Sequence, residues 1–139
     1  MRKTFVLLLA LTAAVSTSFS QDISGTWYGF QTSKDKGVQK EYRITVDFTV
    51  TDDSVTGTMS LKADDKGTIV SKFSGTYDAR KKTMHLNELE VLTEGLSEKD
   101  FSLCEYSLKL EDKVIRGKGR ASNKGFDHLN VYLQRNPNY

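Results

Sequence analysis

Apolar and polar residues alternate with a period of two along most of this chain. The clearest run extends from Tyr42 to Val50, where an apolar side chain occupies every second position. Because successive side chains of a β-strand point to opposite faces, this pattern is typical of strands with one buried and one solvated face. No segment shows the apolar period of 3.6 residues that an amphipathic helix needs. The chain is therefore expected to be built from strands.

Eight segments carry the alternation, and we expect each to be a strand. They cover 23–32, 42–51, 55–63, 69–77, 83–93, 101–111, 114–122 and a last run around 129–133. Clusters of Asp, Lys, Gly and Asn separate most neighbours, which is typical of tight turns. Within 83–93 the apolar positions change phase, so we expect a β-bulge near Asn87 and Glu88.

The regular spacing of these segments predicts how they assemble. Eight antiparallel strands joined in sequence order can close on themselves, and closure removes the exposed edges of an open sheet. We therefore expect an all-β fold, a single eight-stranded antiparallel meander barrel. A two-sheet sandwich is the alternative, because alternation alone does not separate the two. The single proline, Pro137, follows the last strand and interrupts none of them.

The first 20 residues have a different character. Arg2-Lys3 precedes an apolar run over 5–15, and Ser18-Phe19-Ser20 places small residues before Gln21. This order predicts a signal peptide cleaved near Ser20-Gln21, and hence a periplasmic or secreted protein. A buried N-terminal helix or strand is the alternative. The apolar run is shorter than the roughly 20 residues of a membrane-spanning helix, so we expect no transmembrane segment.

Residues 21–139 are expected to form one domain with balanced charge. Loss of Arg2 and Lys3 lowers the basic count from 20 to 18, which equals the 18 acidic residues. A nucleic-acid-binding protein is expected to gather a basic excess on one face, whereas Lys and Arg here alternate with Asp and Glu. We therefore expect no nucleic-acid partner.

Cys104 is the only cysteine, so the chain cannot form an internal disulfide. It lies between Leu103 and Glu105 in a strand-like run. We expect a small core residue at this position, with an intermolecular disulfide as the alternative.

A short glycine pattern recurs on three of the expected strands. It reads Ser24-Gly25-Thr26-Trp27, Thr56-Gly57-Thr58-Met59 and Ser74-Gly75-Thr76-Tyr77, with Arg116-Gly117-Lys118-Gly119 as a looser fourth. Glycine weakens a strand, so its recurrence indicates bends or close backbone contacts that leave no room for a Cβ. The alternative is that these positions merely tolerate glycine.

The early Gly25-Thr26-Trp27 followed by an eight-stranded meander resembles the calycin barrels, which include lipocalins, fatty-acid-binding proteins and avidins. The chain is most similar to small secreted lipocalin-like proteins common in Bacteroidetes-type bacteria. This resemblance implies that Trp27 packs at the closed end of the barrel against a basic residue of the last strand. By position that residue is Arg135, with Arg120 as a substitute.

Three features depart from the better-known calycins. Avidins line their biotin site with several tryptophans, whereas Trp27 is the only one here. The segment 34–41 is too short for the helical pair of fatty-acid-binding proteins, and Cys104 has no partner for a lipocalin disulfide. The resemblance therefore predicts a fold without predicting one specific ligand.

The sequence offers no recognisable catalytic or metal-binding constellation, so we expect neither an enzyme nor a cofactor. The two histidines, His85 and His128, fall on the polar phase of their strands and are expected to face solvent. No serine lies in a nucleophile-elbow motif. The pairs Asp52-Asp53 and Asp64-Asp65 lie in expected turns, where aspartate favours the backbone geometry.

Two acidic residues interrupt apolar surroundings. Strict alternation places Glu88 or Glu105 among buried neighbours, where a carboxyl would have a raised pKa and would anchor a ligand or a proton. A bulge that turns the side chain outward is the simpler interpretation, and we adopt it here.

These observations leave two hypotheses of function. The first is an exported binding protein that holds a small, largely apolar molecule at the open end of the barrel. Its ligand would contact inward aromatic and apolar residues, namely Tyr42, Phe48, Met59, Phe73, Tyr77 and Tyr106. Inward glycines would leave room for it. Gly25, Trp27 and Arg135 would close the other end.

The second hypothesis is a filled barrel that binds or inhibits a protein partner through its loops and outer face. Mixed-charge loops such as Lys34-Asp35-Lys36 are consistent with this interpretation. The volume and polarity of the barrel interior would discriminate between the two.

Overall fold

The computed structural model describes residues 23–35, 37–63, 67–95, 102–121 and 129–136. These ranges contain eight strands and no helix. The strands are β1 (Gly25–Asp35), β2 (Val38–Thr51), β3 (Ser54–Ala63), β4 (Gly67–Asp78), β5 (Thr83–Val91), β6 (Cys104–Glu111), β7 (Val114–Ala121) and β8 (Leu129–Gln134). The predicted signal peptide and its cleavage site lie outside the described residues. In the described ranges, no helix has the length and apolar character needed to cross a membrane.

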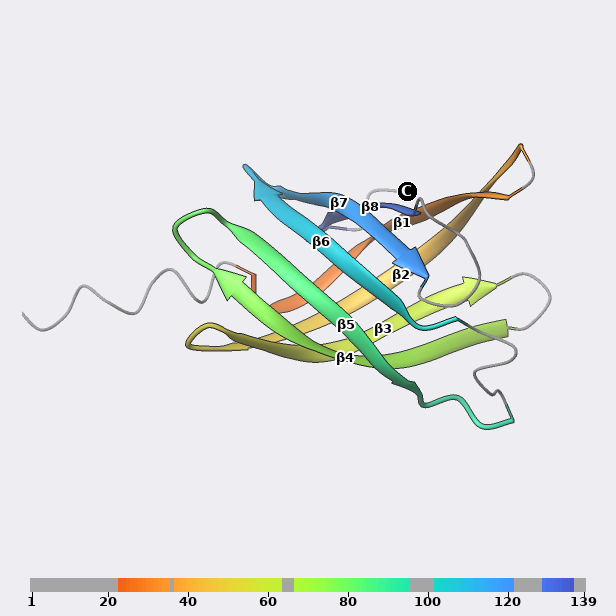
Figure 1. The fold of residues 1–139 in the computed structure, drawn as a ribbon, viewed down its shortest axis with the longest axis horizontal. Helices are drawn as coiled ribbons and strands as arrows, with labels where there is room; N and C mark the ends of the chain where they lie inside the picture. Colours follow the sequence, from red (N-terminus) through yellow and green to blue (C-terminus); the bar gives the residue numbers. More distant parts are fainter. Residues whose placement is uncertain (1–22, 36, 64–66, 96–101, 122–128, 137–139) are drawn as a thin grey trace, which may run out of the picture.

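The strands form a closed antiparallel barrel in sequence order (Figure 1). Each strand pairs with its neighbours in the chain, and β1 closes the barrel by pairing with both β2 and β8. The predicted eight-stranded meander barrel is thus confirmed, and the sandwich alternative is wrong. Closure follows from the even number of up-and-down strands, which leaves no edge unpaired.

The alternation of apolar and polar residues in the sequence matches the alternation of buried and exposed side chains in the structure. On β6, for example, Tyr106 and Leu108 are buried while Glu105 and Ser107 between them are exposed. The inward positions of all eight strands form one hydrophobic core inside the barrel. This burial stabilises the fold by about 25 cal/mol for each Å² of apolar surface removed from water.

The chain reverses at tight turns where the sequence predicted them. Asp52 and Asp112 lie in the turns after β2 and β6 with φ of 56° and 57°. Aspartate tolerates this left-handed conformation better than most residues, because its short side chain can bond to nearby backbone. These turns, together with the β4–β5 turn, gather at the end of the barrel where β1 starts (Figure 1).

Two motif glycines occupy places where strand backbones come close together. A Cβ on Gly57 would lie 1.8 Å from the carbonyl oxygen of Asp47, and one on Gly75 would lie 1.8 Å from that of His85. No side chain fits at such distances. The interpretation that these glycines permit close backbone contact is therefore favoured over mere tolerance.

Candidate functional site

One end of the barrel is sealed around Trp27. The Trp27 ring is buried, and its Nε1–H donates a 2.8 Å hydrogen bond to the carbonyl oxygen of Ile23. The guanidinium carbon of Arg135 lies 4.7 Å from the ring centroid, and Arg135 Nη1 donates to the carbonyl oxygen of Ser24 at 3.2 Å. Gly25, with φ of 111°, lies beside the same guanidinium. Trp27, Arg135 and Gly25 therefore meet at this end.

A group of polar side chains is buried in the other half of the barrel, and we call it the interior polar cluster. Its members are Gln31 on β1, Ser71 on β4, Glu88 on β5 and Cys104 and Tyr106 on β6. Cys104 lies at the first position of β6 and Glu88 three residues before the end of β5. The cluster consequently lies toward the end of the barrel opposite Trp27.

Glu88 points into the barrel, which corrects the expectation that a bulge would turn it outward. The bulge is present, but it lies one residue later: Phe73 pairs with Glu88 while Lys72 pairs with Glu90, so Leu89 is the extra residue. Leu89 is consequently 48% exposed and Glu88 only 6%. The alternation of β5 continues through Glu88 because the ladder is regular up to that residue.

Hydrogen bonds connect the cluster across the barrel. The Tyr106 hydroxyl lies 3.0 Å from Glu88 Oε1 and 3.1 Å from Gln31 Oε1. Since β6 and β1 are not neighbours in the sheet, Tyr106 spans the interior. The other carboxyl oxygen, Glu88 Oε2, is buried and accepts no hydrogen bond from the described residues.

Burial dominates the electrostatics of the cluster. It raises the pKa of the Glu88 carboxyl, and the nearby Ser71 and Tyr106 hydroxyls and Cys104 only partly oppose this shift. Burial also raises the pKa of the Tyr106 hydroxyl well above its ordinary value. Burial therefore shifts the ionisation of each group toward its uncharged form.

Cys104 is a buried thiol, in line with the expected core position. Its Sγ–H donates to the carbonyl oxygen of Ser102 at 3.4 Å. Burial, with the Glu88 charge as a second cause, raises the pKa of the thiol to about 12. A thiol with so little thiolate is a poor nucleophile.

The residues expected to line a ligand site all lie on the inward phase. Five of them, Phe48, Met59, Phe73, Tyr77 and Tyr106, are buried in the core, and Tyr42 is half-buried against it. Phe48 and Phe73 pack edge to face with their ring centroids 5.6 Å apart. Only Tyr106 of this set belongs to the interior polar cluster.

The room expected beside the inward glycines is partly filled. Phe73 Cζ lies 2.8 Å from where a Gly57 Cβ would be, and ring atoms of Tyr106 lie 2.6 and 2.7 Å from that position at Gly119. Aromatic rings thus occupy the space that these glycines leave. The prediction that the glycines would leave this space for a ligand is wrong at both positions.

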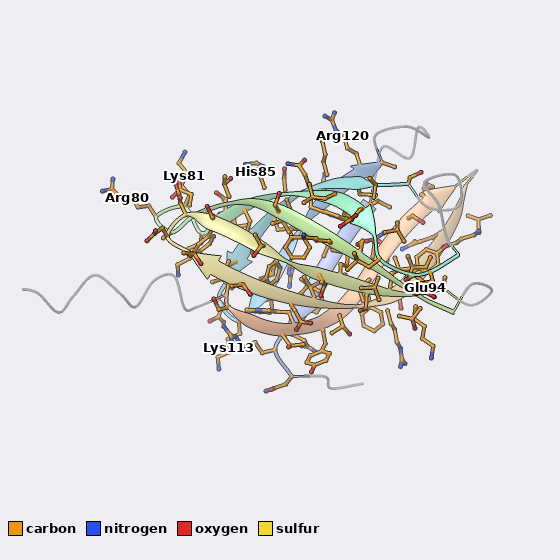
Figure 2. The ribbon with its side chains drawn as sticks, turned by 90° about the horizontal axis from the view of Figure 1, so that it is seen from below. Arg80, Lys81, His85, Glu94, Lys113 and Arg120 are labelled. Carbon is orange, nitrogen blue, oxygen red and sulfur yellow. The ribbon has the colours of Figure 1, made fainter. Side chains whose placement is uncertain are left out.

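Several other residues singled out from the sequence lie outside the barrel. His85 points away from it and contacts Ser107 at 3.1 Å (Figure 2). Glu105 is exposed and pairs with Arg120 at 3.1 Å, so Arg120 does not substitute for Arg135 beside Trp27. His128 falls outside the described residues.

Two hollows lie away from the interior polar cluster. One of about 340 Å³ is lined by Phe30, Glu41, Arg43 and Lys62 on β1, β2 and β3. The other, of about 420 Å³, lies at the turns between β2 and β3 and between β4 and β5.

Sequence reasoning missed two members of the cluster. Gln31 and Ser71 are polar residues on the inward phase of their strands, which is the signal that identifies them. Gln31 shares its phase with Trp27 and Gly29, and Ser71 lies between Ile69 and Phe73.

No protein-family model matches the chain, and the comparison with curated proteins finds no match. Among solved structures, the chain is similar to Rv2717c from M. tuberculosis, with a TM-score of 0.49 and 18% identity over 84% of this chain and 94% of that one. It is also similar to a β-barrel-like protein of domain of unknown function DUF1849 from Brucella abortus, with a TM-score of 0.32 and 13% identity. That alignment covers 81% of this chain and 50% of the other, so this chain spans about half of that protein.

Proposed function

We propose that this chain is an exported, lipocalin-like binding protein whose barrel holds a small, largely apolar molecule in the half opposite Trp27. In this proposal the protein binds its ligand without transforming it and needs no cofactor. The proposed export rests on the basic start of residues 1–20, on the apolar run that follows it, and on the small residues before Gln21. The lipocalin-like assignment rests on the early Gly25-Thr26-Trp27 and on the contact of Trp27 with Arg135.

The observation that carries the proposal is the interior polar cluster. Polar groups inside a small barrel cost stability unless they are paired, and a fully apolar core would fold without this cost. Binding sites are typically apolar cavities with a few convergent polar groups that orient the ligand. Gln31, Glu88 and Tyr106 converge in this way within an otherwise apolar interior.

A fluorescent apolar probe tests this proposal. We expect saturable binding to the full chain, displacement by small apolar molecules, and a weaker affinity when bulk is added at the cluster by Ser71→Phe. The matched control is Ser107→Phe, because Ser107 is exposed on the outer face of β6. Absence of saturable binding, or equal effects of both substitutions, would overturn the proposal.

The filled interaction module remains a second candidate because of the outer hollow lined by Phe30, Glu41, Arg43 and Lys62. It combines an aromatic ring with charges of both signs, as protein interfaces often do. Cross-linking in the native envelope tests this candidate. A cross-link to one partner that is lost in Phe30→Ser supports it, and the absence of any such partner counts against it.

A further inference from the structure

Glu88 Oε2 has no hydrogen-bond partner among the described residues, although Tyr106 contacts Oε1 of the same carboxyl. Ser71 and Cys104 lie near this carboxyl, but neither reaches Oε2 at hydrogen-bond distance. Among the described residues, it is the only buried side-chain oxygen or nitrogen that has no hydrogen-bond partner. An unsatisfied buried acceptor costs about 1 to 3 kcal/mol, so its presence calls for an explanation.

The proton count of the cluster indicates what Oε2 can do. A phenol has one proton, yet the Tyr106 hydroxyl contacts both Glu88 Oε1 and Gln31 Oε1. Both contacts are satisfied if neutral Glu88 donates its Oε1 proton to Tyr106 and Tyr106 donates to Gln31. Burial of Glu88 favours this neutral form. Oε2 is then a carbonyl oxygen that only accepts.

The same conclusion holds for an ionised Glu88 if the Gln31 amide is turned so that its nitrogen donates to Tyr106. Tyr106 then donates to Glu88 Oε1, and Oε2 again has no donor. In both arrangements the missing partner is a hydrogen-bond donor. A ligand carboxylate would instead place an acceptor against an acceptor.

The surroundings of Glu88 describe the rest of the ligand. Its ladder partner is Phe73, and the inward residue two positions earlier on β5 is Leu86, and both are fully buried. A ligand that reaches Oε2 must therefore present an apolar body to the barrel wall and one polar group to the carboxyl.

On the basis of the proposed ligand-binding function, we propose that Glu88 Oε2 accepts a hydrogen bond from a donor at the polar end of the ligand. The barrel accordingly selects amphipathic amines and alcohols over molecules that end in a carboxylate. An alkylammonium enters as a cation and pairs with the carboxylate, so the proton that Glu88 carries in its neutral form is released to solvent when the amine binds. An alcohol donates its hydroxyl to Oε2, and no proton is released.

Octylamine, octanol and octanoate form a matched set of probes because they differ only in the polar group. Titration calorimetry of the full chain compares the three probes at about pH 6, where octanoate is ionised and octylamine is charged. We expect octanoate to bind at least about tenfold more weakly than the other two, which corresponds to about 1.4 kcal/mol. Because burial raises the pKa of Glu88, titrations in two buffers of different ionisation enthalpy should show proton release with octylamine that increases as the pH is lowered, and none with octanol.

Glu88→Gln is the decisive variant because its amide has nearly the same shape and can both donate and accept. We expect it to lose most of the preference for octylamine over octanoate. Glu105→Gln is the matched control, since Glu105 is exposed on the outer face of β6 and should leave the three affinities unchanged. If Glu88→Gln fails to fold, the proton release measured with the wild-type chain still tests the proposal.

The outcomes separate this inference from the proposed function. Equal binding of all three probes, or no proton release with octylamine, overturns the role of Glu88 while ligand binding stands. A buried water on Oε2 would give equal binding, since the water would already satisfy the oxygen. Failure of all three probes and of the apolar fluorescent probe overturns the proposed function and this inference together.

Discussion

Gly57→Ala should destabilise the barrel strongly although it adds a single methyl group. The new Cβ would lie 1.8 Å from the carbonyl oxygen of Asp47 and 2.8 Å from Phe73 Cζ. The ring can rotate away, but the carbonyl belongs to the backbone of β2. Since ordinary contacts of a Cβ begin near 3.4 Å, β2 and β3 must separate by more than about 1 Å at this point.

The expected magnitude follows from the ladder. Separation weakens the pairing of Gly57 with Phe48 and of Thr58 with Asp47. Two weakened backbone hydrogen bonds cost about 0.5 to 1.5 kcal/mol each, and the strain of an overpacked core adds about 1 to 3 kcal/mol. Replacing glycine restricts the unfolded chain and returns about 0.4 to 1 kcal/mol. We expect a net loss of about 2 to 4 kcal/mol.

Urea unfolding followed by tryptophan fluorescence measures this loss, because Trp27 is the single tryptophan and is buried. The matched control is Thr56→Ala, one residue earlier on the exposed face of β3, for which we expect a change within about 0.5 kcal/mol. A loss below about 0.5 kcal/mol for Gly57→Ala, with an unchanged circular dichroism spectrum, would refute the close backbone contact.

Three further predictions concern the two ends of the barrel. Arg135→Met removes the cation above Trp27 and should lower the free energy of unfolding by about 0.5 to 2 kcal/mol, and an unchanged urea midpoint would contradict this. With its pKa raised to about 12, the Cys104 thiol should resist iodoacetamide at pH 8 in the folded chain and react in urea, and equal labelling rates would contradict its burial. Because burial raises the pKa of Glu88, its carboxyl stabilises the fold fully below the ordinary value of 4.5, and this contribution declines as pH rises through the folded pKa. Urea unfolding measured from below pH 4.5 upward should therefore show that the free energy of unfolding of the wild type declines relative to that of Glu88→Gln. Parallel pH profiles of the two proteins would contradict the raised pKa.

Much of the fold could be predicted because strand geometry acts locally. Side chains alternate between faces on every strand, so the positions of Tyr106 and Leu108 on the inward face follow from the sequence alone. The turns at Asp52 and Asp112 could be predicted for the same reason, since they depend on local backbone preferences. The number and order of the strands favoured a closed barrel, but alternation alone left a two-sheet sandwich open.

The candidate site could be predicted only in part. A phase change in β5 indicated a bulge, but its position depends on which β4 residue pairs with which β5 residue. A difference of one residue decides whether Glu88 faces solvent or the interior, because the side-chain period is two. The sequence pattern contains no information on that register.

The contacts across the barrel depend on tertiary structure for a different reason. Gln31 and Tyr106 are 75 residues apart and lie on strands that do not pair, so no local pattern links them. The filling of the space beside Gly57 by Phe73 likewise depends on how side chains from different strands pack together. The sequence by itself determined a chain of eight alternating strands and favoured a barrel, because side-chain alternation is a local property of each strand. Only the tertiary structure decided that the strands close into a barrel and that the interior contains a buried acid, because pairing and packing across the barrel place them. One oxygen of that acid has no partner among the described residues.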